Sequence, residues 1–175
     1  TWKSAWKEGF LSGFALAESG GSLFAASDGV RRAKGPDQEW TRLHVLADSI
    51  SWLLSTETAV LAMTSGGNFV RSSDDGATWA DVVLPGGSFY YWGQPLVARN
   101  GKLFGLDGDN SLLVSSDDGA SFVPVALPAP IAGNWANLLA SNDKGLIVGV
   151  STGAGAGCED VQDATTTLYL STDEG

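Results

Sequence analysis

The sequence predicts an all-β fold made of repeated four-stranded antiparallel sheets. The first observation is an eight-residue motif that occurs at 72–79 and again at 115–122, an offset of 43 residues. The second is a pair of short apolar runs around a polar turn, which recurs between the motifs. The third is that no stretch of the chain shows sustained helical periodicity. Four antiparallel strands in every 40 or so residues are typical of a β-propeller blade.

The repeated motif reads S-x-D-x-G-x-[TS]-aromatic and suits a tight turn between the third and fourth strands of a blade. Its Asp carboxylate can accept hydrogen bonds from N–H groups of its own turn, and its Gly supplies a positive φ. The Ser or Thr hydroxyl can close a second local bond, and the aromatic buries a large apolar area. We therefore expect structural roles for Ser72, Asp74, Gly76, Thr78 and Trp79, and for Ser115, Asp117, Gly119, Ser121 and Phe122.

Two further copies of the motif are incomplete. The copy at 33–40 keeps only its final aromatic, Trp40. The other begins at Ser171 and continues with Asp173 and Gly175, for which we expect the same structural role.

The start of the chain offers the residue types that would complete this last copy. Thr1 and Trp2 match its final Thr and Trp, with one residue missing in between. We therefore expect the strand at 2–6 to belong to a split blade and the chain to be a partial propeller. Closure within one chain, and closure between two copies, are the alternatives.

Polar turns between apolar runs divide the rest of the chain into strands. Asn100-Gly101, for example, separates Leu96-Val97-Ala98 from Leu103-Phe104-Gly105, and Asn-Gly in such a place is a strong hairpin signal. The third strands are expected at 68–71, 111–114 and 167–170. The four blades are expected at about 10–44, 50–84, 90–127 and 134–175 within a single propeller segment, 1–175.

The motif S-x-D-x-G-x-[TS]-W resembles the Asp-box, or bacterial neuraminidase repeat (BNR). This repeat occurs in the propellers of sialidases, some glucanases, the sortilin family and photosystem assembly factors. The resemblance extends over essentially the whole chain and implies a sialidase-like or sortilin-like scaffold. It implies little about function, because these families do different things on one fold. It also implies that the boxes lie on the face opposite the ligand site.

Sialidase chemistry needs an arginine triad, a Tyr–Glu pair and an acidic Asp. Arg71 directly precedes a box and Arg32 occupies the equivalent place, so both are features of the repeat. The Arg-Ile-Pro signature of a sialidase first blade is absent from the sequence. Glycoside hydrolysis in general needs two opposed carboxylates, and 20 acidic residues guarantee some pairs by chance. The residues therefore favour a non-catalytic protein with no catalytic residue of its own.

Candidate ligand-binding residues come from loops that should lie opposite the boxes. Tyr90-Tyr91-Trp92 is the densest aromatic cluster and follows a loop between blades. Asp107 and Asp109 resemble the opening of a calcium loop, but the expected Gly and Glu are missing, so a polar hairpin turn is favoured. The insertion at 151–165 is either a functional loop or a tolerated one. The candidate binding residues are Tyr90, Tyr91, Trp92, Asp107 and Asp109.

Composition excludes several partners. A net charge of −10 disfavours nucleic acid and anionic membranes, since both need Lys and Arg. One Cys and one His cannot build a zinc site, and no apolar run is long enough to span a membrane. We expect no metal and no cofactor.

The function expected from these observations is that of a non-catalytic binding or scaffolding propeller, secreted or in the cell envelope, with a protein or carbohydrate ligand. The remaining blades of the same propeller, or a second copy, are further possible partners. The alternative is a segment of a sialidase-like or other glycoside hydrolase whose catalytic residues lie partly outside this chain. That alternative predicts two carboxylates a few ångströms apart beside Tyr91 or Trp92.

Overall fold

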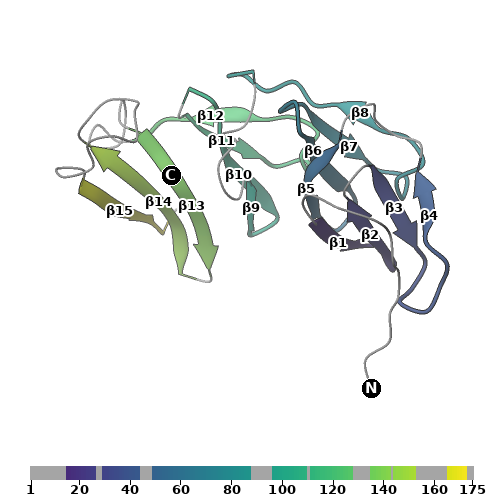
Figure 1. Ribbon diagram of the computed structural model, residues 1–175. Coiled ribbons are helices and arrows are strands. Elements are labelled where there is room, and N and C mark those ends of the chain that lie inside the picture. The colour runs from purple at the N-terminus through teal and green to yellow at the C-terminus, as the bar shows by residue number, and fades with distance from the viewer. Residues whose placement is uncertain are drawn as a thin grey trace. The chain divides into compact units, whose positions relative to one another are not determined.

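The computed structural model is all-β, as the sequence predicts. It describes residues 15–26, 29–43, 49–87, 96–109, 111–127, 135–142, 144–152 and 165–172. These ranges form antiparallel sheets and contain no helix (Figure 1). Accordingly, no helix in the described ranges has the length and apolar character needed to cross a membrane.

Each sheet is a meander in which strands adjacent in sequence pair side by side. The first contains β1 (Ala15–Ser19), β2 (Ser22–Ala26), β3 (Val30–Ala33) and β4 (Thr41–Leu43), and the second contains β5 (Ile50–Ser55), β6 (Val60–Thr64), β7 (Phe69–Ser72) and β8 (Ala80–Asp81). The third contains β9 (Leu96–Arg99), β10 (Lys102–Leu106), β11 (Leu112–Ser115) and β12 (Val123–Val125), and the described part of the fourth contains β13 (Trp135–Asn142), β14 (Gly145–Thr152) and β15 (Thr165–Ser171). This strand order is that of propeller blades.

The hairpins between first and second strands follow from their turn residues. Gly20 and Gly21 have φ values of 57° and 78°, and Asn100 and Gly101 have φ values of 50° and 73°. Two consecutive positive φ values define the type I′ turn, whose twist matches that of the flanking strands. In the fourth sheet the Asn142 side chain takes a similar role, because its Oδ1 accepts hydrogen bonds from the N–H groups of Lys144 and Gly145.

The register around the boxes is the same in three sheets. The residue directly before the box always pairs with the residue directly after its aromatic: Arg32 with Thr41, Arg71 with Ala80, and Val114 with Val123. The third strands β7 and β11 begin and end one residue later than expected, because the first Ser of the box still pairs with the second strand.

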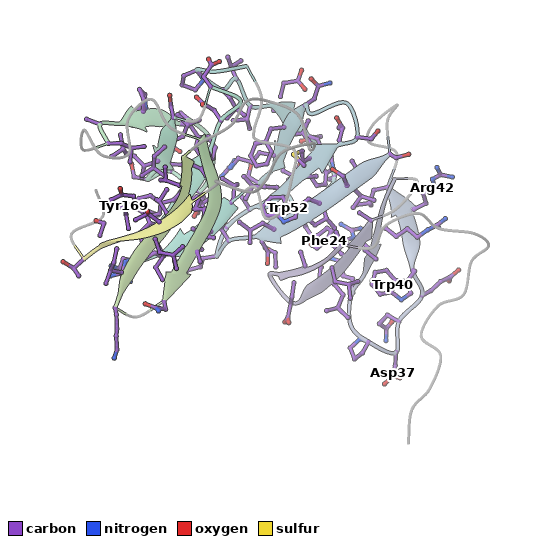
Figure 2. The ribbon with its side chains drawn as sticks, turned by 60° about the vertical axis from the view of Figure 1, so that its left-hand side comes forward. Phe24, Asp37, Trp40, Arg42, Trp52 and Tyr169 are labelled. Atoms are coloured by element: carbon purple, nitrogen blue, oxygen red, sulfur yellow. The ribbon has the colours of Figure 1, made fainter. Side chains whose placement is uncertain are left out.

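The chain divides into two compact units, Thr1–Val82 with Asp118–Ala120, and Val83–Asp117 with Ser121–Gly175. Within each unit the core lies between two successive sheets. The first unit's cluster contains Phe24 (labelled in Figure 2), Ala26, Val30, Ile50, Leu53, Val60, Ala62 and Val70. The second unit's cluster contains Val97, Phe104, Leu106, Leu112, Leu139, Leu146, Val148 and Val150.

Inner strands therefore contact each other within each unit: β1 contacts β5, and β9 contacts β13. The strand expected at 2–6 lies outside the described residues, and so do residues 173–175 of the box that this end of the chain was expected to complete.

Candidate binding face and the turns that support it

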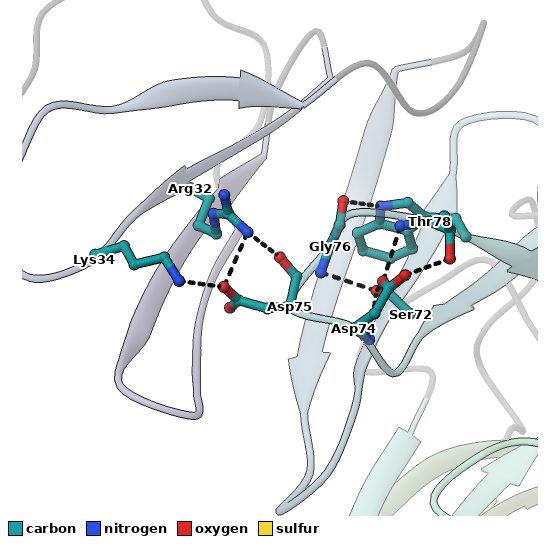
Figure 3. A network of polar contacts seen from close by, with 8 residues as sticks. Arg32, Lys34, Ser72, Asp74, Asp75, Gly76 and Thr78 are labelled. Carbon is teal, nitrogen blue, oxygen red and sulfur yellow. Dashed lines mark hydrogen bonds and ion pairs between the residues drawn. The ribbon is translucent and has the colours of Figure 1, made fainter.

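The box at 72–79 is a turn that satisfies its own polar groups (Figure 3). Asp74 Oδ1 accepts the Thr78 N–H at 2.8 Å, and Asp74 Oδ2 accepts the Thr78 hydroxyl at 2.5 Å. The Ser72 hydroxyl donates to Asp74 Oδ1 at 2.8 Å and accepts the Gly76 N–H at 2.9 Å. The Trp79 indole donates to the Gly76 carbonyl at 3.1 Å. Both carboxylate oxygens of Asp74 are thus engaged inside the turn.

The box at 115–122 repeats these contacts. Asp117 accepts the Ser121 N–H at 2.9 Å and the Ser121 hydroxyl at 2.6 Å, and the Ser115 hydroxyl donates to Asp117 at 2.8 Å. The aromatic of this box, Phe122, is buried. Ser171, the first residue of the last box, ends β15, whereas Asp173 and Gly175 lie outside the described residues.

These hydrogen bonds lower the pKa of both box carboxyl groups. The hydroxyl of Thr78, followed by its N–H and by Ser72, lowers the pKa of Asp74 to about 2. The Ser121 hydroxyl likewise leads the causes that lower the pKa of Asp117 to about 2. A hydrogen bond to the charged form favours that form, so both carboxylates stay ionised at neutral pH, unlike a general acid.

The fourth residue of each complete box accepts a hydrogen bond from the arginine that stands directly before the box one repeat earlier. Arg32, on β3, donates through Nη1 to the main-chain oxygen of Asp75 at 2.6 Å and to its Oδ2 at 2.9 Å (Figure 3). Arg71, on β7, donates through Nε to the main-chain oxygen of Asp118 at 2.9 Å. The hydroxyl of Thr58 donates to the Asp118 carboxylate.

Sequence reasoning missed Asp75 and Asp118. The available signal was that both complete boxes carry Asp at this variable position and that an Arg precedes the box in the repeat before. Burial raises the pKa of Asp75, but hydrogen bonds from Ser22 and Lys34 and the charge of Arg32 outweigh it, so this pKa lies below its ordinary value.

At the end of the sheet opposite the box, a turn leads into the third strand, and a buried polar side chain stabilises this turn. Asp107 is 2% exposed, and its Oδ1 accepts the N–H groups of Asp109 at 3.0 Å and Ser111 at 2.8 Å. In the second sheet, Thr64 occupies the same place 43 residues earlier, is also 2% exposed, and accepts the Asn68 N–H through Oγ1 at 3.1 Å. Turn formation therefore accounts for the observed contacts of Asp107.

The loop between the second and third sheets contacts this turn through Gly86. The Cα of Gly86 is so close to the Asp107 carboxylate that an added Cβ would be 2.4 Å from Oδ2. Gly86 belongs to a turn closed by the hydrogen bond from Gly87 N–H to the Leu84 carbonyl at 3.1 Å. The buried carboxylate thus joins the turn at 84–87 to the turn at 107–111, and it leaves Asp109 exposed.

The other candidate binding residues are not placed by the structure. Tyr90, Tyr91, Trp92 and nearly all of the insertion at 151–165 lie outside the described residues, although β14 and β15 extend to its two ends. Ligand binding by Asp107 and Asp109 stays a prediction. Within the described ranges no group of three His, Cys, Asp or Glu residues is arranged to hold a metal ion.

Comparisons with solved structures identify the fold. YCF48 from Cyanidioschyzon merolae matches with a TM-score of 0.54 and 12% identity, over 87% of this chain and 57% of that chain. A structure of YCF48 bound to D1 peptide matches with a TM-score of 0.56 and 12% identity, over 78% and 46%. The GH74 enzyme of Niastella koreensis matches with a TM-score of 0.56 and 17% identity, over 78% and 22%.

These proteins are β-propellers, which agrees with the fold of this chain. The chain spans about half the length of the YCF48 chains that it matches. No family model and no curated protein matches the sequence. The likeness therefore shows the fold, and the Asp-box family remains a resemblance of motif.

Proposed function

We propose that this chain is a non-catalytic binding propeller of the Asp-box type, which holds a segment of another protein on the loops opposite its boxes. The observation that carries the proposal is that the two ends of β11 differ: one end is a turn whose carboxylate is fully engaged, and the other end is a turn with an exposed carboxylate. At one end, the box carboxylate of Asp117 is engaged by its own turn. At the other end, two hydrogen bonds to Asp107 hold its turn, which contacts a second loop through Gly86 and presents Asp109 to solvent.

Two further facts support a protein partner. A rigid scaffold with exposed loops is the usual setting for recognition, and YCF48, which shares the fold, is solved with a bound peptide. The net charge of −10 favours a basic partner through electrostatic steering. We therefore propose a basic protein segment as the ligand, met in a secreted or cell-envelope location.

Electrostatics also disfavours the glycoside hydrolase alternative. A glycosidase needs one carboxylic acid whose pKa is raised, so that it can donate a proton. Among the residues that the structure describes, the carboxyl groups with a shifted pKa are those of Asp74, Asp75 and Asp117, and each of these pKa values is lowered.

The test uses two residues at opposite ends of β11, Asp109 and Ser116, both exposed. A display library of random linear peptides is selected on the whole chain, and enriched peptides are measured by fluorescence anisotropy. We expect the enriched peptides to be basic, and Asp109→Asn to weaken their binding roughly tenfold because a negative charge at the binding site is removed. Ser116→Lys, on the box side, changes the net charge in the same direction by the same amount and should change affinity much less.

Equal weakening by the two substitutions would point to general charge attraction and contradict a specific loop face. Enrichment of no peptide, or loss of binding with Ser116→Lys alone, would also contradict the proposal. Hydrolysis of aryl glycosides by the whole chain would favour the enzyme alternative. Cell fractionation tests the proposed location, which a cytoplasmic protein would contradict.

A further inference from the structure

The fourth sheet carries two exposed leucines on one face of β15. Leu168 and Leu170 are 61% and 59% exposed, and they lie two residues apart, which places both side chains on the same side of the strand. Large apolar side chains gathered on one sheet face point to an interaction site.

The same position is buried in the other three sheets. Counted back from the first residue of each box, Leu168 is equivalent to Val30, Phe69 and Leu112, which are 0%, 3% and 1% exposed. The sheet face that carries this position is therefore a core face in the first three sheets.

In both units the cover is the next sheet along the chain. Val30 and Phe24 of the first sheet pack in one cluster with Leu53 and Val70 of the second sheet. Equivalent residues of the third sheet, Phe104 and Leu112, cluster with Leu139 and Val148 of the fourth sheet. We call the face of a sheet that packs against the sheet before it in the chain its receiving face. We call the opposite face, which packs against the sheet after it, its donating face. In the fourth sheet the donating face carries Leu168 and Leu170.

The first sheet has a receiving face of its own. Its cross-strand row is Leu16–Ala25–Arg31, and it matches the rows Leu53–Ala62–Val70 of the second sheet and Leu139–Val148–Tyr169 of the fourth. Leu16 is 71% exposed, although its equivalents Leu53 and Leu139 are each 5% exposed. Within the described ranges, the donating face of the fourth sheet and the receiving face of the first sheet thus carry leucines in contact with solvent.

The polar contact between sheets provides a second match. In the first unit, Arg32 stands directly before the box of its sheet and binds Asp75, the fourth residue of the next box. On the donating face of the fourth sheet, Leu170 takes the place of Arg32. In the box at 33–40, Pro36 takes the place of Asp75 and is exposed. The apolar residues Leu170 and Pro36 therefore occupy the two positions that Arg32 and Asp75 occupy in the first unit.

We propose that the donating face of the fourth sheet docks onto the receiving face of the first sheet of a second copy of this chain. The contact is head-to-tail and repeats the packing between successive sheets, with Leu168 buried against the Leu16 row and Leu170 against Pro36. The proposed exchange is reciprocal: each chain of the pair would use both of its faces, and an assembly of two copies would then be closed.

Sedimentation equilibrium of the whole chain tests the proposal. We expect a species of twice the chain mass, and Leu170→Glu should convert it to monomer because a charge would be buried without a partner. Val83→Glu is the matched control, since Val83 is 87% exposed and lies on neither face. Circular dichroism verifies that each variant is folded. A wild-type chain that stays monomeric would overturn the proposal, as would a dimer unaffected by Leu170→Glu.

A rebuilt ion pair tests the partner and the orientation. Leu170→Arg alone and Pro36→Asp alone should each weaken the dimer roughly tenfold, because each buries an unpaired charge. The double variant recreates the Arg32–Asp75 pair across the interface and should recover most of the loss. Both substitutions lie at exposed positions and should leave the fold intact. Additive weakening in the double variant would show that Leu170 and Pro36 do not meet, and would overturn the proposed docking.

Discussion

Arg32 binds Asp75 through both the main chain and the side chain: Nη1 lies 2.6 Å from the carbonyl oxygen and 2.9 Å from Oδ2. The two residues are 43 positions apart and belong to successive sheets. Because the carbonyl is part of the box, the contact holds the turn itself and not only one flexible side chain. The pair thus couples the local structure of one sheet to the packing of its neighbour.

Removing this contact should destabilise the first unit. Arg32→Ala leaves the Asp75 carbonyl and carboxylate without their half-buried partner, and we expect a loss of about 1–2 kcal/mol in the free energy of unfolding. Lys34→Ala is the control, because the Lys34 side chain is 69% exposed and its ion pair with Asp75 should contribute little. Urea denaturation measures both, and equal effects would contradict a special role for Arg32.

The box glycine should tolerate no side chain. Gly76 has a φ of 77°, and an added Cβ would be 2.6 Å from Leu43 Cδ1 and 3.0 Å from Phe24 Cε1. Gly76→Ala should therefore cost about 1–3 kcal/mol from overpacking in addition to backbone strain.

Gly101→Ala separates the two contributions. Gly101 has a similar φ of 73°, and nothing lies within 4 Å of its added Cβ. Thermal unfolding of both variants isolates the packing cost as the difference between them. A Gly101→Ala effect as large as that of Gly76→Ala would show that backbone strain alone is responsible.

The box carboxylates should make stability depend on acid pH. The pKa values of Asp74 and Asp117 are about 2 in the folded chain, below the ordinary value of 3.8. Their contribution is therefore fully present above about pH 4 and is lost as the pH falls toward 2. The double substitution Asp74→Asn, Asp117→Asn should flatten the fall in melting temperature over this range. Asp109→Asn, on an exposed turn, is the control, and an unchanged slope in the double variant would contradict the assignment.

Asp74 should matter for stability and not for ligand binding. Asp74→Ala removes the acceptor of the Thr78 N–H and hydroxyl and should lower the melting temperature. Peptides selected on the whole chain should bind the folded variant with unchanged affinity. Lost binding at an unchanged melting temperature would assign Asp74 to a ligand site instead.

The buried polar residues at the other end of the sheets should behave as turn supports. Asp107→Asn keeps an oxygen that can accept the N–H groups of Asp109 and Ser111, whereas Asp107→Ala leaves both without an acceptor. We expect Asp107→Ala to cost about 1–3 kcal/mol more than Asp107→Asn in urea denaturation. Similar losses would indicate that the negative charge, and not the accepted hydrogen bonds, is what this site requires.

The sequence by itself determined the strand order, the Asn-Gly and Gly-Gly hairpins, and the self-contained chemistry of the boxes. The physical reason is that these features depend on φ preferences and hydrogen bonds within about eight residues, which the local residue types dictate. The position of Asp107 at the end of a strand was also evident, but its burial under Gly86 was not, because that contact joins two loops.

Only the tertiary structure decided which face of each sheet is covered and where the third strands end. Arg32 finds its acceptor 43 residues away, and Leu168 is exposed although its equivalents Val30 and Leu112 are core residues. The sequence pattern alone does not distinguish these positions. Apolar periodicity shows that one face of a strand can be buried, but it does not show which element packs against that face. Packing between successive sheets makes that choice, and it separates buried core residues from exposed residues that look alike in the repeat.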